Sequence, residues 1–185
     1  MKHIIKPALS LFVVAALSAV SLGIIYNVTL EPIENNRRRV QERMLREILA
    51  EAHAFREKQT RTYGSMVRVF EGLLEDETVV GYVIELAPMG YGGAINMMVG
   101  ISKKQNAVSG MRVLRHSETP GFGAYIVRES FFRRFDGISL NPLTVVRRSP
   151  GENEIQAITS STITTQAVTN AVNEAIEWYN REAGR

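Results

Sequence analysis

The run Ile158-Thr159-Ser160-Ser161-Thr162-Ile163-Thr164-Thr165 carries six hydroxyl side chains in eight positions. An amphipathic segment follows it directly, with apolar residues on one helical face at Ala167, Val168, Ala171, Val172, Ala175, Ile176 and Tyr179. This period predicts a final helix over residues 164–182. A helix N-terminus attracts anions because its first N–H groups are unpaired and its dipole is positive there. One N-cap accounts for one hydroxyl, so the excess favours a phosphate-bearing ligand.

The composition is that of a globular domain, since 45% of the 185 residues are hydrophobic and 22% are charged. The net charge of +3 is scattered, apart from one cluster at Arg37, Arg38 and Arg39. Nucleic-acid binding needs a concentrated basic face, so no nucleic-acid partner is expected. The chain has no cysteine, which excludes disulfides and thiol nucleophiles. Its three histidines lie far apart in the sequence, so no metal site is expected.

The N-terminal part of the chain is apolar over a length that suits a membrane. Residues 7–30 carry no charged side chain, and residues 8–25 are almost wholly apolar or small. Such a helix reaches roughly 30 Å at ~1.5 Å per residue, enough to cross the hydrocarbon core. The run exceeds the about 7–15 apolar residues of a signal peptide, and no clean small-x-small site closes it. Residues 1–30 are therefore expected to form an uncleaved anchor, whose orientation the flanking Lys and Arg residues leave open.

The rest of the chain predicts an α+β fold. Residues 31–62 are expected to form a helical connector, because Ile33–Arg61 is rich in Arg, Glu, Ala and Leu, lacks Gly and follows a proline. A short helix is expected at Glu129–Phe135. Strands are expected, from β-branched apolar runs, at Val79–Ala87, Ala94–Ser102, Val108–Arg115 and Leu143–Arg147. Residues 63–185 are thus predicted to be one domain with an antiparallel sheet and flanking helices.

Three loops rich in glycine or hydroxyl groups follow these elements, at residues 88–93, 116–123 and 159–165. Each has an ordinary explanation when taken alone. The glycines suit a tight turn, and Thr119-Pro120-Gly121 suits a β-turn with Pro at its second position and Gly at its third. Glu118 suits a solvated carboxylate, and His116 suits a structural hydrogen-bonding role because it lacks a partner for nucleophilic chemistry.

Taken together, however, the loops form a combination with a known counterpart. Its parts are Tyr91-Gly92-Gly93-Ala94-Ile95, Val99-Gly100-Ile101, His116-Ser117-Glu118-Thr119-Pro120-Gly121-Phe122-Gly123, and the hydroxyl run before Ala167-Val168. Over nearly the whole chain they resemble the FMN-binding domain of the G subunit of the Rnf electron-transport complex. The C subunit of the sodium-pumping NADH:quinone oxidoreductase shares this domain but is usually longer. The single anchor and the chain length favour the G subunit, and a C-type subunit remains the alternative.

The resemblance implies that Thr162 carries FMN through a phosphoester bond installed by a flavin transferase. The family motif is Ser/Thr-Gly-Ala-Thr/Ser; here Ser160 stands at the usual Gly, Ser161 at the usual Ala, and Gln156 where an acidic residue is common. The resemblance also implies that a second loop borders the isoalloxazine ring, where backbone N–H groups could bind its carbonyls. The residues of that loop are Glu118, Thr119, Pro120 and Gly121. The other expected cofactor contacts are Thr159, Ser160, Ser161, Ile163, Thr164, Thr165, Tyr91, Gly92 and Phe122.

The implied function is that of an electron-transfer subunit of an ion-translocating ferredoxin–NAD oxidoreductase. It would be a single-pass protein of the cytoplasmic (inner) membrane, with its domain on the periplasmic or outer face. Its implied partners are the other Rnf subunits, membrane lipid and the flavin transferase. Two alternatives stay open: a domain that binds FMN non-covalently, given the changes at Ser160 and Ser161, and an anchored scaffold without a cofactor. A serine hydrolase is disfavoured because the chain lacks a GxSxG elbow and a convincing base.

Overall fold

The computed structural model describes residues 2–183, which form two compact units divided between Glu42 and Arg43. A single helix, α1 (Lys2–Ile48), contributes to both units. Within the first unit, Ala8–Tyr26 has a mean hydropathy of 2.4 and is long and apolar enough to cross a membrane. The described side chains of this stretch lie almost entirely exposed, as expected of a helix whose apolar surface has no protein partner.

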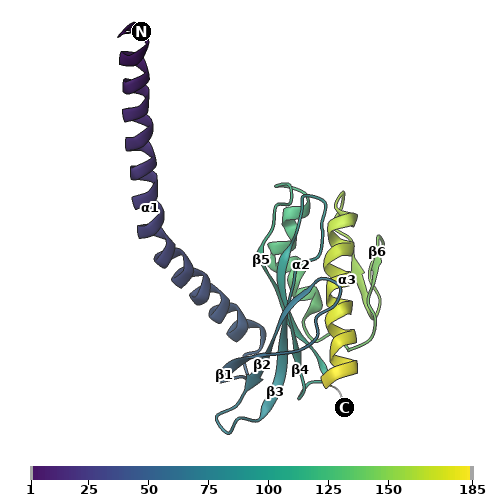
Figure 1. Ribbon diagram of the computed structural model, residues 1–185. Helices are drawn as coiled ribbons and strands as arrows, with labels where there is room; N and C mark the ends of the chain where they lie inside the picture. The colour runs from purple at the N-terminus through teal and green to yellow at the C-terminus, as the bar shows by residue number, and fades with distance from the viewer. Residues whose placement is uncertain (1, 184–185) are drawn as a thin grey trace. The chain divides into compact units, whose positions relative to one another are not determined.

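The second unit is built on a five-stranded antiparallel sheet (Figure 1). Its strands lie in chain order: β1 (Ala54–Lys58), β2 (Met66–Leu73), β3 (Val79–Leu86), β4 (Asn96–Ser102) and β5 (Ala107–Arg115). Strands β3 and β4 are buried over most of their length and β5 over its first half, which explains their apolar sequences. Such burial requires cover on both faces of the sheet.

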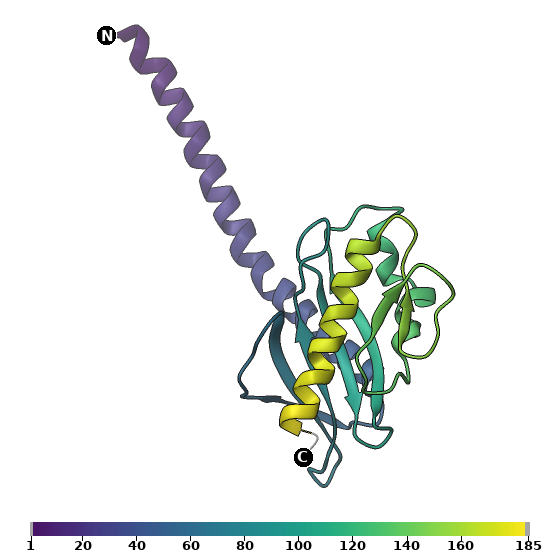
Figure 2. The same ribbon diagram turned by 90° about the vertical axis from the view of Figure 1, so that its right-hand side faces the viewer.

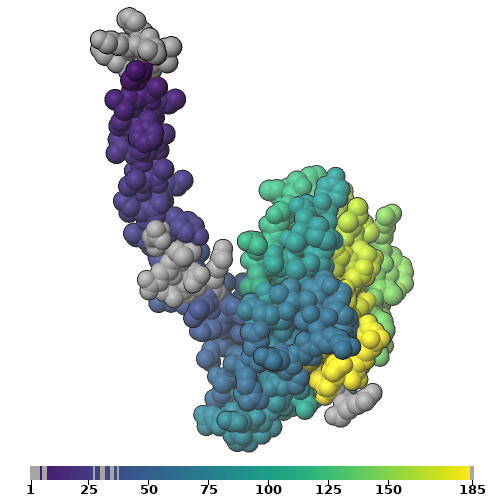
Figure 3. Space-filling model, viewed as in Figure 1, coloured from purple at the N-terminus to yellow at the C-terminus, as the bar shows by residue number. Residues whose placement is uncertain are grey.

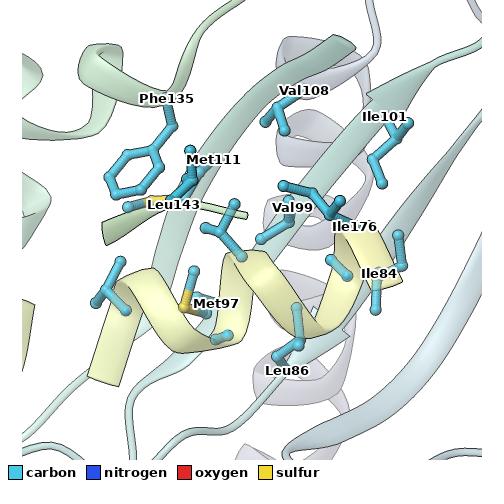
Figure 4. Close-up of a cluster of buried hydrophobic side chains, with 14 of the residues drawn as sticks. Ile84, Leu86, Met97, Val99, Ile101, Val108, Met111, Phe135, Leu143 and Ile176 are labelled. Atoms are coloured by element: carbon cyan, nitrogen blue, oxygen red, sulfur yellow. The ribbon is translucent and has the colours of Figure 1, made fainter. Parts of the chain in front are cut away.

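One face is covered by α3 (Thr162–Trp178), which continues into the π-helical turn η3 (Tyr179–Ala183). Figure 2 shows α3 lying along the sheet, and in Figure 3 its yellow surface adjoins the teal strands. Alternate strand residues such as Ile84, Val99 and Met111 are fully buried in the cluster beneath this helix. The close-up in Figure 4 shows Ile176 of α3 among these side chains. The apolar stripe that predicted the final helix is thus its core-facing side.

Shorter elements complete the same apolar cluster. They are η1 (Gly123–Val127), α2 (Glu129–Phe132), η2 (Arg133–Phe135), and a parallel two-stranded sheet of β6 (Thr144–Val146) and β7 (Glu154–Gln156). Phe131 and Phe135 meet edge to face with ring centroids 5.7 Å apart. Leu143 and Ile155 bring the small sheet into the cluster. Of these elements, η1 and β6 contact α3 directly.

The other face is covered by the last turn of α1 and the residues just after it. Ile48 and Leu49 are buried there against Phe70, Val83 and Met98, which alternate with the residues that face α3. The close approach depends on glycines in the strands. A side chain at Gly72 would overlap Leu49, and one at Gly100 would overlap Ile48. The end of α1 therefore belongs to the folded unit.

One expectation about these elements is wrong, and two strands were missed. The helix expected over Ile33–Arg61 ends at Ile48, and residues 54–58 form β1 instead. Strand β2 was not expected, nor was β7. Charged residues obscured β2, but each is paired: Arg68 with Glu85 at 2.7 Å, and Glu71 with Lys58 at 2.8 Å. The hydrogen bond from Lys58, reinforced by Arg56, holds the pKa of Glu71 below its usual range.

The other elements agree with expectation. The fold is α+β with an antiparallel sheet, as predicted. The strands expected over 79–87, 94–102 and 108–115 correspond to β3, β4 and β5, and the strand expected at 143–147 contains β6. The helix expected at Glu129–Phe135 is present as α2 and η2, and the final helix starts two residues earlier than expected. The apolar patterns of these segments were therefore sufficient to locate them.

Candidate functional site

The three loops singled out in the sequence meet at one end of the sheet. In the antiparallel register Leu86 of β3 lies opposite Met97, and Asn96 of β4 lies opposite Arg115 of β5. The loop after β3 and the loop after β5 therefore leave the sheet at the same end. The first turn of α3 joins them, because Thr164 Oγ1 donates a hydrogen bond to Glu118 Oε2 at 2.7 Å.

A cavity of about 550 Å³ opens between these loops. Its lining residues are Tyr91, Glu118, Thr119, Phe122, Gly123, Ser160, Ser161, Thr162, Ile163 and Thr164. All of them except Gly123 were expected to contact the cofactor. Gly123 closes the glycine-punctuated loop and gave no sign of its own in the sequence. The cavity thus collects groups that are 73 residues apart in the chain, from Tyr91 to Thr164.

Five of the expected residues do not line this cavity. Gly92 is exposed and donates its N–H to Glu118 Oε1 at 2.9 Å. Thr165 is fully buried beneath the hydroxyl loop. Pro120 and Gly121 form an exposed turn closed by the N–H of Phe122 and the carbonyl of Thr119, with Gly121 at φ +81°. Thr159 faces a separate hollow of about 310 Å³ that also contains Arg128 and Arg134.

Apart from Thr159, which faces the other hollow, the five remaining hydroxyls of the run divide into two groups. Thr164 Oγ1 bonds to Glu118, and Thr165 Oγ1 donates to the Ser161 carbonyl while accepting from the Ile158 N–H. Ser160, Ser161 and Thr162 have no side-chain hydrogen bond to any residue that the structure describes, and all three line the cavity. The excess of hydroxyls noted in the sequence is therefore partly structural and partly available to a ligand.

The N-terminus of α3 has no side-chain cap. Ser161 occupies the N-cap position but makes no capping hydrogen bond, and the first helical N–H bonded to its carbonyl is that of Thr165. The N–H groups at the start of α3 are therefore open to an acceptor that enters the cavity. An anionic phosphate suits this position because the helix dipole is positive there. Thr162 is the first residue of the helix and carries its hydroxyl at this point.

The rim of the cavity is apolar and exposed. Tyr91 is 74% exposed, Ile163 60% and Phe122 50%. Among the described residues that line the cavity, Glu118 is the one charged side chain, and no Lys or Arg is present. The site therefore combines an exposed aromatic and aliphatic rim with an uncapped helix start. A flat aromatic ligand carrying a phosphate fits both features.

Ser160 adopts a left-handed conformation with φ +63°. This conformation costs an L-residue about 1–2 kcal/mol, and a glycine at this position would avoid that cost. Glycine also makes the unfolded chain more flexible, which offsets about 0.5–1 kcal/mol of the gain. We therefore expect Ser160→Gly to raise the free energy of unfolding by about 0.5–1 kcal/mol, as measured by chemical denaturation. Ser149→Gly is the control, because Ser149 is exposed and is not among the positive-φ residues. Equal effects of the two substitutions would contradict the strain at Ser160.

The chain is similar to proteins of one kind over nearly its whole length. The FMN-binding domain family model matches residues 90–177, which include every residue lining the cavity. The G subunit of the ion-translocating oxidoreductase complex of Methanosarcina acetivorans is 28% identical, over 99% of this chain and 98% of the relative. The G subunit of the Na(+)-translocating ferredoxin:NAD(+) oxidoreductase complex of Acetobacterium woodii is 34% identical, over 96% and 92%.

A solved structure supports the fold. The C subunit of the Na(+)-translocating NADH-quinone reductase from Parabacteroides distasonis superposes with a TM-score of 0.52 and 23% identity, covering 62% of this chain and 61% of that one. The similarity shows that the two share an arrangement of elements.

Proposed function

Because the chain belongs to the family of G subunits of ion-translocating ferredoxin:NAD oxidoreductase (Rnf) complexes, we propose that it relays electrons through FMN esterified to Thr162. Membership makes it an electron-transfer flavoprotein subunit with an FMN-binding domain, and the other Rnf subunits are its partners. The G subunits of Methanosarcina acetivorans and Acetobacterium woodii match over 98% and 92% of their length, which favours this assignment over a C-type one. The ester, the residues that hold it and the anchoring belong to the proposal.

The observation that carries the ester is a free hydroxyl at an uncapped helix start. Thr162 Oγ1 has no hydrogen-bond partner among the described residues, and it lines the cavity beside the open N–H groups of α3. These groups would hold the phosphate oxygens of the ester. Bound FMN would supply electron-transfer chemistry, while the protein supplies binding and orientation. Ser160, Ser161 and the backbone around Ile163 would complete the phosphate site.

The charges in the cavity favour a covalent bond over simple binding. A phosphate held non-covalently gains most of its binding energy from charge-assisted bonds to Arg or Lys, and the described lining residues offer neither. The carboxylate of Glu118 adds a negative charge instead. An ester bond removes the need for a counter-charge, because dissociation no longer competes. This argument weighs against the non-covalent alternative.

The remaining residues have roles set by their place around the cavity. Tyr91, Phe122 and Ile163 would contact the isoalloxazine ring from the rim. Thr119 would contact the ring from the 116–123 loop, and Pro120 and Gly121 would shape the turn of that loop. Gly92 and Thr165 would support the lining residues indirectly, through hydrogen bonds to Glu118 and to the 158–161 backbone. Thr159 is the weakest member of the expected set, since it faces the other hollow.

An intact-mass measurement tests the proposal. We expect the full-length chain, co-expressed with a flavin transferase, to be heavier by one FMN minus one water and to stay fluorescent in a denaturing gel. Peptide mass spectrometry should place the added mass on the peptide that contains Thr162. A flavin that washes out on denaturation would support the non-covalent alternative. A bare polypeptide mass in the presence of an active transferase would support the scaffold alternative.

The proposal includes a membrane anchor at residues 1–30 and an FMN-binding domain at residues 63–185, with the connector 31–62 now containing the end of α1 and β1. The apolar stretch Ala8–Tyr26 supports the anchor and its contact with lipid. The domain lies on the outer face in this proposal. A cysteine placed at the exposed Lys104 of this cysteine-free chain tests the side, since a membrane-impermeant maleimide should label it in intact cells. Labelling after lysis alone would place the domain inside.

A further inference from the structure

The carboxylate of Glu118 lies at the centre of the candidate site and is 5% exposed. Its two oxygens bind donors from two different parts of the chain. Oε1 accepts the Gly92 N–H at 2.9 Å, and Oε2 accepts the Thr164 hydroxyl at 2.7 Å. One side chain thus connects the loop after β3 and the first turn of α3, and it does so from the loop after β5.

The surroundings of this carboxylate leave it little freedom. A Cβ atom at Gly90 would overlap Oε1, and one at Gly123 would overlap Oε2. The backbone of Glu118 is also held, because its N–H donates to His116 Nδ1 at 3.1 Å. The glycines on either side therefore form a slot that the carboxylate fills. This burial excludes the ordinary alternative, in which Glu118 is a solvated loop carboxylate.

We propose that Glu118 is a positioning residue that holds the flavin site in its finished shape before the cofactor is attached. It acts through its two acceptor atoms, by tying Gly92 and Thr164 to its own loop. This inference rests on the proposed function of the site and adds how the site is assembled.

The physical reason is the cost of ordering loops. Fixing a residue of backbone costs conformational entropy, and three unconnected loops would carry that cost at the moment when the ligand arrives. A site ordered beforehand spares the incoming reaction that cost. Attack by a hydroxyl also requires a well-defined position, and a shift of about 1 Å can slow a reaction by about a hundredfold. Thr164 lies two residues after Thr162 in the same helical turn, so its bond to Glu118 fixes the turn that carries the acceptor.

Hydrogen exchange on the full-length chain without flavin tests the connection by itself. We expect the Gly92 amide of the wild type to be protected. We expect Glu118→Ala to exchange this amide at least about tenfold faster, because its acceptor is gone. Glu118→Gln should keep the protection, since an amide oxygen can accept from Gly92 while its NH₂ group donates to Thr164 Oγ1. Unchanged exchange in Glu118→Ala would overturn the proposal.

The matched control is Glu71→Ala. Glu71 is also a buried glutamate with two partners, since it accepts from Lys58 and Arg56 at 2.8 and 2.9 Å, but it does not line the cavity. Its removal should destabilise the sheet edge without changing exchange at Gly92. Faster Gly92 exchange in both variants would show general loosening of the fold and would count against a specific role for Glu118.

The rate of flavin attachment tests the consequence. With a purified flavin transferase and its flavin donor, we expect Glu118→Ala to be modified at least about tenfold more slowly than the wild type, and Glu118→Gln to stay within about threefold. Thr164→Val, which removes one of the two bonds, should fall between them, and Glu71→Ala should match the wild type. Thr164→Val keeps the test open if Glu118→Ala fails to fold.

The outcomes separate the two proposals. A Glu118→Gln variant as slow as Glu118→Ala would show that the negative charge matters and would overturn positioning through acceptor atoms. A wild-type chain that never takes up flavin would refute the proposed function, while the exchange measurement would still decide whether Glu118 orders the loops.

Discussion

Thr162→Ala is expected to remove all covalent flavin from the full-length chain while leaving the fold in place. The hydroxyl oxygen is the proposed attachment atom, so its loss leaves no site for the phosphoester. Thr162 is the partly exposed first residue of α3, and alanine is well tolerated in a helix. The free energy of unfolding should therefore change by no more than about 0.5 kcal/mol. In-gel fluorescence and intact mass measure the flavin, and chemical denaturation measures the stability.

Neighbouring hydroxyls supply matched controls for this experiment. Ser160 and Ser161 line the same cavity and have no side-chain hydrogen bond among the described residues. Ser160→Ala and Ser161→Ala should each retain covalent flavin, and Thr162→Ser should retain it at a reduced rate, since it keeps the oxygen. Covalent fluorescence in the Thr162→Ala protein would show that the flavin is attached to another residue, and it would refute the assignment of Thr162.

Trp178→Ala should have the largest effect on stability, a loss of about 3–5 kcal/mol in the free energy of unfolding. Trp178 ends α3, is fully buried, and meets Tyr82 of β3 edge to face with ring centroids 5.3 Å apart. Removing its ring opens a cavity between the helix and the sheet. A domain is stable by about 5–15 kcal/mol in total, so the loss is a large part of it. Because α3 carries Thr162 at its other end, flavin attachment should fall as the folded fraction falls.

Trp178→Phe is the control for this substitution. The indole Nε1 is buried and has no hydrogen-bond partner among the described residues, so replacing it removes an unsatisfied donor along with part of the ring. We expect a loss below about 2 kcal/mol, measured by urea denaturation of the detergent-solubilised chain. If Trp178→Phe lost as much free energy of unfolding as Trp178→Ala, the indole nitrogen would contribute more to stability than its lack of a hydrogen-bond partner indicates.

The fold was predictable where apolar periodicity was strong. The stripe of α3 and the apolar runs of β3, β4 and β5 located these elements, because their burial follows directly from their own residues. The end of α1 was not predictable in this way. Residues 49–61 have the composition of a helix, but Leu49 and Ala52 are buried against the sheet and β1 pairs with β2. Tertiary pairing overrides local propensity there.

The site divides in a similar way. A helix beginning at the hydroxyl run followed from local pattern, although α3 starts at Thr162, two residues before the expected Thr164. Thr162 as the attachment residue, and the loop residues Tyr91 and Glu118, came from the resemblance to the family. No local pattern brings residues 91, 118 and 162 together, since their meeting depends on the strand register and on where α3 is docked. The left-handed conformation of Ser160 was equally unpredictable from local pattern. The resemblance placed a glycine of the family motif at this position, and glycine adopts positive φ without strain.

The lack of a cationic side chain around the cavity has a consequence for how the cofactor is maintained. A site filled by an ester has an occupancy set by synthesis and hydrolysis, and the concentration of free FMN in the surrounding compartment does not enter. A chain that loses its flavin by hydrolysis would stay empty, because phosphate finds no Lys or Arg among the described lining residues to recapture it. If FMN is esterified as proposed, loading would be a single event in the life of each molecule, completed during maturation and dependent on the transferase for any repair.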